Sequence, residues 1–238
     1  MSESAEQEAG DAMAAQVVRE TPVFADTALD AWLDALGARI VAVADSQRRD
    51  WHFTVIDRDD LNAFAIPGGH VFVHRGLLAA AGSMSEVAGV LGHEIAHVTL
   101  RHSARQLGKR TRTGVIVGLF CTVTGWCAGD VAQVAIEIGG AAWMARHSRS
   151  DEAQSDSAAI EYLVRAGIDP AGVTRMFERM AAERTTKPGA IEAFFSSHPL
   201  DDQRVNSTRA QVSRARPGPS LQVDDSVFVR VRPGRGAG

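Results

Sequence analysis

Apolar residues recur at helical intervals between residues 83 and 98, and this stripe predicts an amphipathic helix. Ser83 and Glu86 stand at its start with the spacing of a capping box. Gly89 and Gly92 lower its intrinsic helix propensity, and we interpret them as sites of close backbone packing. Basic residues follow the stripe and favour a long helix that continues beyond it: Arg101, Arg105, Lys109 and Arg110.

Other stretches predict a further helix and a small sheet. Asp26 is placed to cap a helix that extends to Val43 with apolar residues at helical spacing. Residues 52–56 alternate in character as a half-buried strand does, and residues 62–66 and 70–73 flank a Pro-Gly-Gly turn. These patterns predict an α+β fold that is mostly helical and contains a small sheet.

The composition indicates one compact domain with appendages. The chain has 238 residues, a net charge of −4 and 45% hydrophobic residues, which allows a real core and argues against a nucleic-acid partner. We expect an N-terminal extension over residues 1–20, a main domain over 21–216 and an appendage over 217–238.

The predicted appendage begins with a Pro/Gly-rich linker at residues 217–220. Residues 221–223 and 227–231 then predict a short strand, and the Gly-rich end from Pro233 onward is expected to be disordered. The strand either adds to the edge of the sheet, which we favour, or folds back into the cleft.

An uncharged apolar run extends from residue 114 to residue 129. It is shorter than the roughly 20 residues that a membrane-spanning helix needs, so we favour a buried helical hairpin over a lip that dips into a membrane. Cys121 and Cys127 within it are expected to be free thiols. The start of the chain has no apolar segment of the signal-peptide type.

The residues His93, Glu94 and His97 form an HExxH motif inside the predicted helix. Positions four apart fall on one helical face, so both imidazoles can bind one zinc ion. Zinc brings the pKa of a bound water toward about 7. Glu94 then stands beside that water and takes its proton as the water attacks a peptide carbonyl. The motif therefore predicts a zinc hydrolase.

A catalytic zinc ion needs a third protein ligand. Residues 148–156 offer Glu152 and Asp156, which are four apart and share one helical face. We predict that Glu152 binds the metal, with Asp156 beside it to orient a ligand. His102 is nine residues from His93, about half a turn away around a continuous helix, and we interpret it as structural or surface-exposed.

With these residues the chain resembles the zinc metalloendopeptidases that include the HtpX-like and BepA-like bacterial proteases and the CAAX prenyl proteases. Four blocks carry the resemblance, in the order and spacing of that family: Asn62–Gly69 with Arg75–Leu78, His93–His97 with Arg101 and His102, Ser148-Arg149 with Glu152 and Asp156, and Ser197-His198-Pro199 with Arg204. Residues 6–10 and 19–23 also resemble the start of the mature BepA-like domain. The resemblance covers roughly residues 5–210.

The resemblance implies a zincin-like domain of the minigluzincin type. His93, His97 and Glu152 would bind one Zn²⁺ ion, and Glu94 would act as the general base. Asp156 would orient His93 through a hydrogen bond to its other ring nitrogen.

The resemblance also assigns the remaining candidate residues. His198 would either stabilise the tetrahedral oxyanion or occupy the open metal position in a latched state. Asn62, Ala63 and Phe64 would bind the peptide along an edge strand by main-chain hydrogen bonds. A hairpin that only closes the sheet would hold the same three residues for packing, and both interpretations can be true.

The predicted function is a zinc endopeptidase that acts on unfolded or misassembled envelope proteins, the substrate class that the resemblance implies. Its partners would be extended polypeptides and envelope assembly components, at or near a membrane surface, with no nucleic acid. We expect a periplasmic or membrane-associated location with the leader absent from this chain, and a cytoplasmic location stays open. The alternative function is a chaperone-like binding module that keeps the zinc fold in a latched state.

Overall fold

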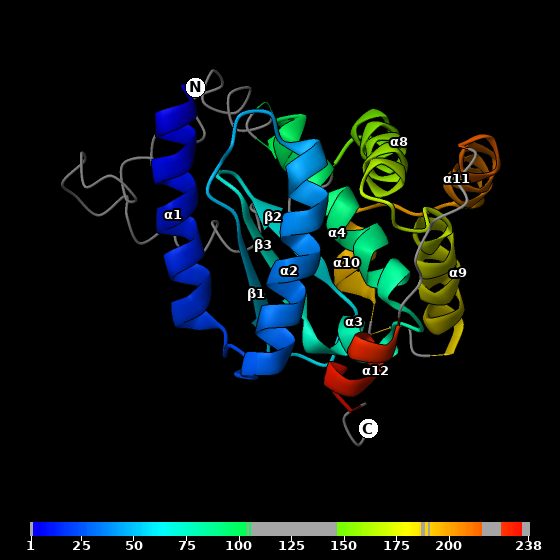
Figure 1. Cartoon of the computed structure of the whole chain (residues 1–238), viewed down its shortest axis with the longest axis horizontal. Helices are drawn as coiled ribbons and strands as arrows, with labels where there is room; N and C mark the ends of the chain where they lie inside the picture. The colour runs from blue at the N-terminus through cyan, green and yellow to red at the C-terminus, as the bar shows by residue number, and fades with distance from the viewer. Residues whose placement is uncertain are drawn as a thin grey trace.

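A small sheet lies between helices in the computed structural model of this chain (Figure 1). The structure describes residues 2–103, 105, 147–186, 189, 191–215 and 225–234. Within these ranges most residues are helical, and three strands form one sheet. The predicted α+β class with a mostly helical chain is therefore confirmed.

The sheet has the strand order β1-β3-β2. β1 (His52–Ile56) is parallel to β3 (His70–His74), and β2 (Ala63–Ile66) is antiparallel to it. The turn between β2 and β3 contains Gly68 and Gly69 at φ 89° and 105°, where residues with a Cβ are rarely found. All three predicted strands are present, and β2 is an edge strand of the described sheet.

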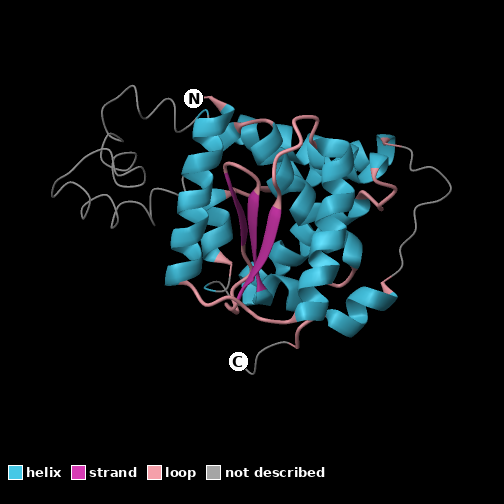
Figure 2. Cartoon of the chain, turned by 60° about the vertical axis from the view of Figure 1, so that its left-hand side comes forward, coloured by secondary structure: helices cyan, strands magenta, loops and turns pink. Residues whose placement is uncertain are grey.

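Helices cover both faces of this sheet (Figure 2). α1 (Glu3–Glu20) packs its apolar residues, among them Ala14, on Ile56, Ile66 and Phe72. The opposite face forms the main core with α2 (Thr27–Ala44). Residues that the sequence suggested as an N-terminal extension therefore form one layer of the fold.

α2 begins where the sequence predicts, at Asp26. The carboxylate of Asp26 accepts hydrogen bonds from the backbone amides of Ala28 and Leu29, two of the donors that a helix start leaves unpaired. Leu33 and Ile40 on its inner face are fully buried.

α4 (Met84–Thr99) is the helix of the HExxH motif. Ser83 caps it by accepting from the amide of Glu86, but the Glu86 carboxylate accepts from Gly82 rather than from Ser83, so the capping box is only half formed. The predicted unbroken continuation past Arg101 is wrong, and Lys109 and Arg110 lie outside the described residues. The helix ends at Thr99, because Arg101 adopts the left-handed φ of 57°.

α4 is buried between α8 (Arg149–Arg165) and α9 (Ala171–Thr186). A Cβ on Gly89 would lie 2.8 Å from the backbone of Val173 in α9, and one on Gly92 would lie 2.9 Å from the side chain of Leu163 in α8. The close packing that these glycines predict is confirmed, and it brings α8 within reach of the motif.

The other helices among the described residues are α3 (Arg75–Ala80), α10 (Glu192–Ser197), α11 (Asp202–Arg214) and α12 (Ser226–Val231). α12 replaces the short strand predicted over residues 227–231, and it joins neither the sheet nor the cleft. Phe228 is fully buried and stacks on Trp32 of α2 at 5.0 Å between ring centroids. The Asp225 carboxylate accepts a hydrogen bond from the amide of Met84 at the start of α4.

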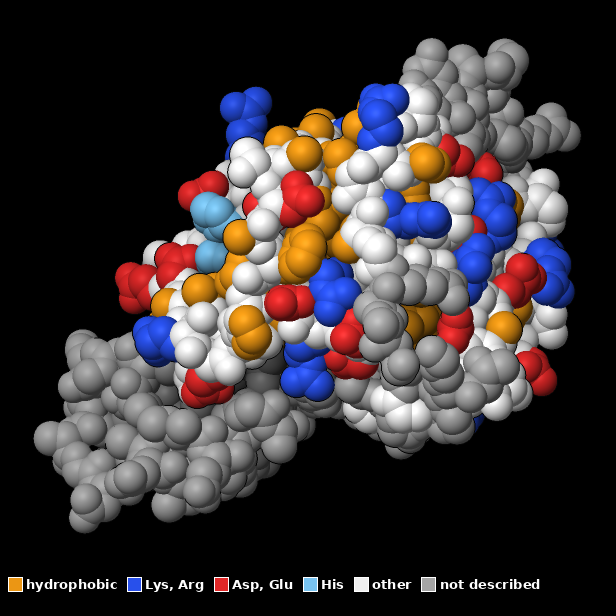
Figure 3. All heavy atoms as spheres, turned by 90° about the horizontal axis from the view of Figure 1, so that it is seen from below, with side chains coloured by type: hydrophobic (Ala, Val, Ile, Leu, Met, Phe, Trp, Pro, Cys, Tyr) orange, Lys and Arg blue, Asp and Glu red, His pale blue; other side chains and the backbone are white. Residues whose placement is uncertain are grey.

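The burial of one aromatic ring explains why α12 is a helix. A strand would alternate Val227, Phe228 and Val229 between two faces, whereas the helix turns Phe228 inward and leaves the two valines 40% and 61% exposed. The end of the molecule where α12 lies shows hydrophobic side chains among basic and acidic ones (Figure 3).

Several sequence predictions lie outside the described residues: the apolar run 114–129 with its two cysteines, the linker and residues 221–223, and the last four residues. Among the described helices, none combines the length and the apolar character that crossing a membrane requires.

We expect that Phe228→Ala lowers the free energy of unfolding by about 3–5 kcal/mol, because the change empties a closed site beside Trp32. Val229→Ala, on the exposed side of the same helix, is the matched control and should change it by about 0.5 kcal/mol or less. Urea unfolding of the whole chain measures both. Equal effects of the two variants would show that α12 does not dock on α2.

Candidate metal centre

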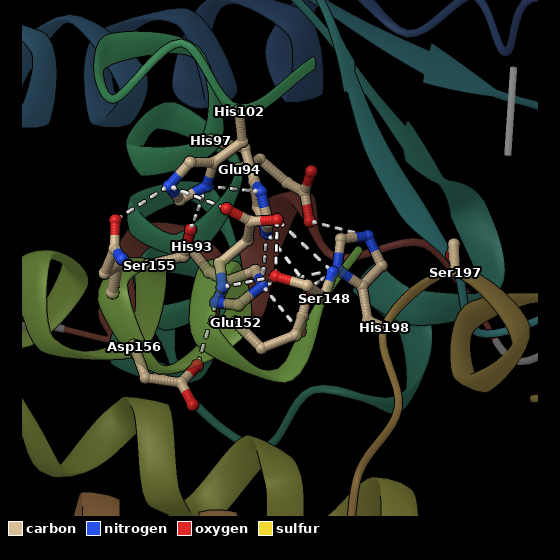
Figure 4. Close-up of polar contacts among 12 residues, drawn as sticks. His93, Glu94, His97, His102, Ser148, Glu152, Ser155, Asp156, Ser197 and His198 are labelled. Atoms are coloured by element: carbon tan, nitrogen blue, oxygen red, sulfur yellow. Dashed lines mark hydrogen bonds and ion pairs between the residues drawn. The ribbon is translucent and has the colours of Figure 1, made fainter. Parts of the chain in front are cut away.

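Three segments bring four buried side chains to one point. His93 and His97 come from α4, Glu152 from the first turn of α8, and His198 from the residue that ends α10. One ligand atom from each lies within 4.8 Å of all the others. Figure 4 shows these side chains pointing toward one another.

The imidazole and carboxylate atoms are closely spaced. His93 Nε2 and His97 Nε2 are 3.0 Å apart, and Glu152 places its oxygens 3.5 Å from His93 Nε2 and 3.4 Å from His97 Nε2. His198 Nδ1 lies 3.1 Å from Glu152 Oε1 and 3.3 Å from His93 Nε2. Each of these four side chains is at most 2% exposed.

The start of α8 explains the position of Glu152. Ser148 and Asp151 form a complete capping box, in which each side chain accepts from the backbone amide of the other. Glu152 therefore stands in the first helical turn, where the positive end of the helix dipole stabilises a carboxylate. Burial would raise the pKa of Glu152, but His198 and the other two imidazoles hold it well below its usual value.

Asp156, one turn further along α8, contacts His93 on the side of its ring that faces away from the other proposed ligands. Its Oδ1 lies 2.9 Å from His93 Nδ1, the ring nitrogen that faces away from the other ligands. Burial would lower the pKa of His93, but Asp156 and Glu152 raise it to about 10. The family resemblance implies a hydrogen bond from Asp156 to His93, and the structure brings the two groups to ion-pair distance.

Arg204 of α11 balances the two buried carboxylates. Its guanidinium donates two hydrogen bonds to Asp156, at 2.9 and 2.7 Å, and lies 2.7 Å from Glu152 Oε2. It also donates to the backbone carbonyl of Pro199, beside His198. The sequence pointed to Arg204 only as part of the family pattern; its buried bidentate contact is a tertiary feature.

Glu94 lies in the same buried space and is 1% exposed. Its Oε1 is 3.6 Å from His198 Nε2. Burial raises the pKa of Glu94 above its ordinary value. A carboxylate with a raised pKa accepts and releases protons more readily near neutral pH, as a general base must.

Two further histidines adjoin the ligands. His102 is 1% exposed, so of the two predicted alternatives it takes the structural one and not the surface position, and its Nδ1 lies 3.0 Å from His97 Nδ1. His147 was missed; its ring centroid is 3.9 Å from that of His97. Burial and the neighbouring His198 lower the pKa of His147 to about 3. Its place directly before the Ser148 cap was the available signal.

The donor set fits a divalent transition metal. Two imidazoles and a carboxylate are the ligand types of catalytic zinc sites. A neutral imidazole is the form that binds a metal. Burial lowers the pKa of His97 strongly, so this ligand is already neutral, whereas His93, whose pKa is raised, must release a proton when a metal binds. These side chains converge without exposure to water, which would be costly unless a cation shared their charge.

Of the three predicted peptide-binding residues, Ala63 and Phe64 lie on β2 and Asn62 directly precedes it, but two of the three are buried. Asn62 and Ala63 are 2% and 0% exposed, while Phe64 is partly exposed and stacks on Phe72 at 5.1 Å. Ala65 of β2 lies beside the motif, and its backbone favours the ionised form of Glu94.

Comparison with known proteins agrees with this site. The family model for peptidase family M48 matches residues 27–212, which include every candidate ligand. The chain belongs to peptidase family M48. The family resemblance that the sequence motifs carry is confirmed, and so is the enzyme class, metallopeptidase.

Curated M48 relatives carry protease names. The chain is 30% identical to the beta-barrel assembly-enhancing protease of Yersinia pestis over 94% of its own length and 47% of the relative. The chain is 28% identical to the protein of that name from Escherichia coli (strain K12), over 95% of its own length and 48% of the relative. The chain is also 30% identical to the mitochondrial metalloendopeptidase OMA1 of Schizosaccharomyces pombe, over 75% of its own length and 51% of the relative. The chain spans about half the length of these M48 relatives.

We expect that Arg204→Met destabilises the metal-free protein by about 3–5 kcal/mol, because two buried carboxylates lose their cation. Arg209→Met, on the same helix, is the matched control. Arg209 pairs with Glu178 at the surface, so its loss should cost about 1 kcal/mol or less. Urea unfolding at neutral pH with a chelator present measures both, and a small effect at residue 204 would contradict the proposed charge balance.

Proposed function

We propose that this chain is a zinc-dependent endopeptidase in which His93, His97 and Glu152 bind the metal. The convergence of these three buried side chains around one point carries the proposal, and M48 membership supports it. The same arguments favour the zincin-like architecture that the sequence suggested.

Glu94 is the proposed general base. When bound, zinc supplies Lewis acidity and lowers the pKa of coordinated water toward about 7. Glu94, next to His93 in the chain, accepts the proton of the attacking water at its carboxylate and returns it to the leaving amine. Asp156 holds His93 in place, and Arg204 keeps both carboxylates ionised in the buried site.

We propose that the substrate is an extended polypeptide bound along β2. The register of the sheet helps to define the contact. His74 donates its amide to the carbonyl of Asn62, so Asn62 and, two residues on, Phe64 direct their backbone groups toward β3. Ala63 and Ala65 direct theirs toward the free edge, where a peptide can pair with little sequence preference.

The position of His198 supports a second candidate, a latched state. His198 Nδ1 stands among the metal ligands and its Nε2 faces Glu94. The ring stacks on Phe194 at 4.9 Å, and Arg204 holds the neighbouring carbonyl. Because the motif residues are at most 2% exposed, substrate enters only after part of this arrangement moves. A chain that stays latched would act as a binding module.

The names of the relatives suggest where such an enzyme acts. Two of them are called beta-barrel assembly-enhancing proteases. We propose by analogy that the substrates are unfolded or misassembled envelope proteins and that the partners are envelope assembly components. A periplasmic or membrane-associated location fits this proposal.

We expect Glu94→Gln to bind one zinc ion per chain and to hydrolyse casein at least about a hundredfold more slowly, because the amide cannot accept the proton. Glu152→Ala should lose zinc. Zinc quantitation after dialysis, with a casein cleavage assay, separates the two effects. Glu161→Ala, at an exposed position of α8, the helix that carries Glu152, is the control and should match the wild type in zinc content and in the rate of casein cleavage. Casein cleavage by Glu94→Gln at the wild-type rate would refute the assigned base.

We expect His198→Ala to cleave casein faster than the wild type, with zinc content unchanged, because the alanine cannot occupy the position among the ligands. A slower variant would instead assign His198 to stabilisation of the oxyanion. If wild type and variant bind zinc and neither cleaves casein, the binding module is favoured.

A further inference from the structure

His97 lies at the inner end of a chain of polar contacts that leads out of the candidate metal centre. Its Nε2 faces His93 and Glu152, so Nδ1 is the nitrogen left for another partner. That partner is His102 Nδ1, at 3.0 Å. Figure 4 shows the His102 ring beside His97, on the side of Ser155.

Two ring nitrogens at this distance share one proton. If His97 carries it on Nδ1, Nε2 keeps the lone pair that binds a metal. If His102 carries it, the proton of a neutral His97 must be on Nε2, and His97 cannot bind the metal through that atom. The tautomer of His102 therefore decides whether His97 can act as a ligand.

The surroundings of His102 select the first arrangement. Its Nε2 lies 3.3 Å from Gln154 Oε1 and 3.7 Å from Asp151 Oδ1, and both are acceptors, so Nε2 carries the proton. Gln154 donates through its own amide nitrogen to Ser150, which keeps the amide oxygen toward His102. The Ser155 hydroxyl lies 3.2 Å from His102 Nδ1 and, as a donor, shares the single lone pair of that nitrogen with the Nδ1–H of His97.

The helix end makes this contact possible. On a continuous helix, position 102 would lie about 140° around the axis from His97. The left-handed turn at Arg101 ends α4 and folds His102 back beneath His97. Arg101 in turn is held by Glu6 of α1, at 2.7 Å, and Glu6 is buried. The layer formed by α1 thus supports the turn.

Charge explains why this partner is an imidazole. His93 already has a carboxylate behind it, Asp156, and Arg204 compensates that charge. A second buried carboxylate behind His97 would need another cation. A neutral imidazole accepts the same proton without adding charge.

We propose that His102 is a positioning residue that holds His97 as the Nδ1-protonated tautomer through an ordered chain from Gln154 and Asp151. The inference rests on the proposed metal centre and adds to it the residue that prepares His97 for the metal. It predicts that the tautomer is set before any metal binds.

The test compares His102→Leu with His102→Asn. The two side chains have nearly the same shape and leave the same space, but only asparagine offers an oxygen at the position of Nδ1. Competition with a chelator should give a zinc dissociation constant about 10–100-fold weaker for His102→Leu. His102→Asn should stay within about threefold of the wild type, because it still accepts from His97.

A second readout needs no metal. Long-range ¹H–¹⁵N spectra of the zinc-free protein report which ring nitrogen of His97 is protonated. We expect Nδ1 in the wild type and in His102→Asn, and a mixture of tautomers in His102→Leu. If His102→Leu fails to fold, Gln154→Met replaces it, since Gln154 is exposed and its loss removes only the outer acceptor. Gln154→Met should also weaken zinc binding, by a smaller factor than His102→Leu.

Equal zinc affinities for the leucine and asparagine variants would overturn the inference and leave His102 a packing role, as would a wild-type His97 protonated at Nε2. A wild-type protein that binds no zinc would instead refute the proposed function. The tautomer measured without zinc decides the inference in that case too.

Discussion

The close packing of α4 against α8 is the constraint on which the candidate site depends. Gly92 lets the two helices approach until the side chain of Leu163 fills the space of a missing Cβ. At that separation the imidazoles of one helix reach the carboxylates of the other. A larger residue at this position would have to displace the side chain of Leu163 and would crowd Ala159 of α8.

Burial turns this proximity into a problem of charge. Glu152 and Asp156 are almost inaccessible to water, and an ionised carboxylate there needs a cation or several hydrogen bonds. Arg204 supplies one cation to both, and the proposed zinc ion would supply another. Because Arg204 also holds the carbonyl next to His198, the charge balance and the placement of His198 depend on one side chain. If the proposed latch opens, it therefore disturbs the same contacts that keep the site stable.

The two proposed histidine ligands have different partners at Nδ1, the ring nitrogen that faces away from the proposed metal position. His93 contacts a carboxylate, and His97 contacts a neutral imidazole that α8 and the turn after α4 hold in place. This asymmetry limits the buried negative charge while it orients both rings. It also connects the site to α1, through the contact between Glu6 and Arg101.

Local chemistry in the sequence was sufficient for much of this protein. The caps at Asp26 and Ser83, the strands around the Pro-Gly-Gly turn and the HExxH motif all depend on neighbours within a few residues, and each lies where its pattern predicts. Glu152 and Asp156 could be proposed because their spacing of four places both on one helical face. Only the tertiary structure decided the rest, because it depends on contacts between distant segments. The left-handed turn at Arg101, just after α4, brings His102 under His97. The burial of Phe228 against Trp32 makes a helix of an apparent strand, and Arg204 reaches two carboxylates about fifty residues earlier in the chain.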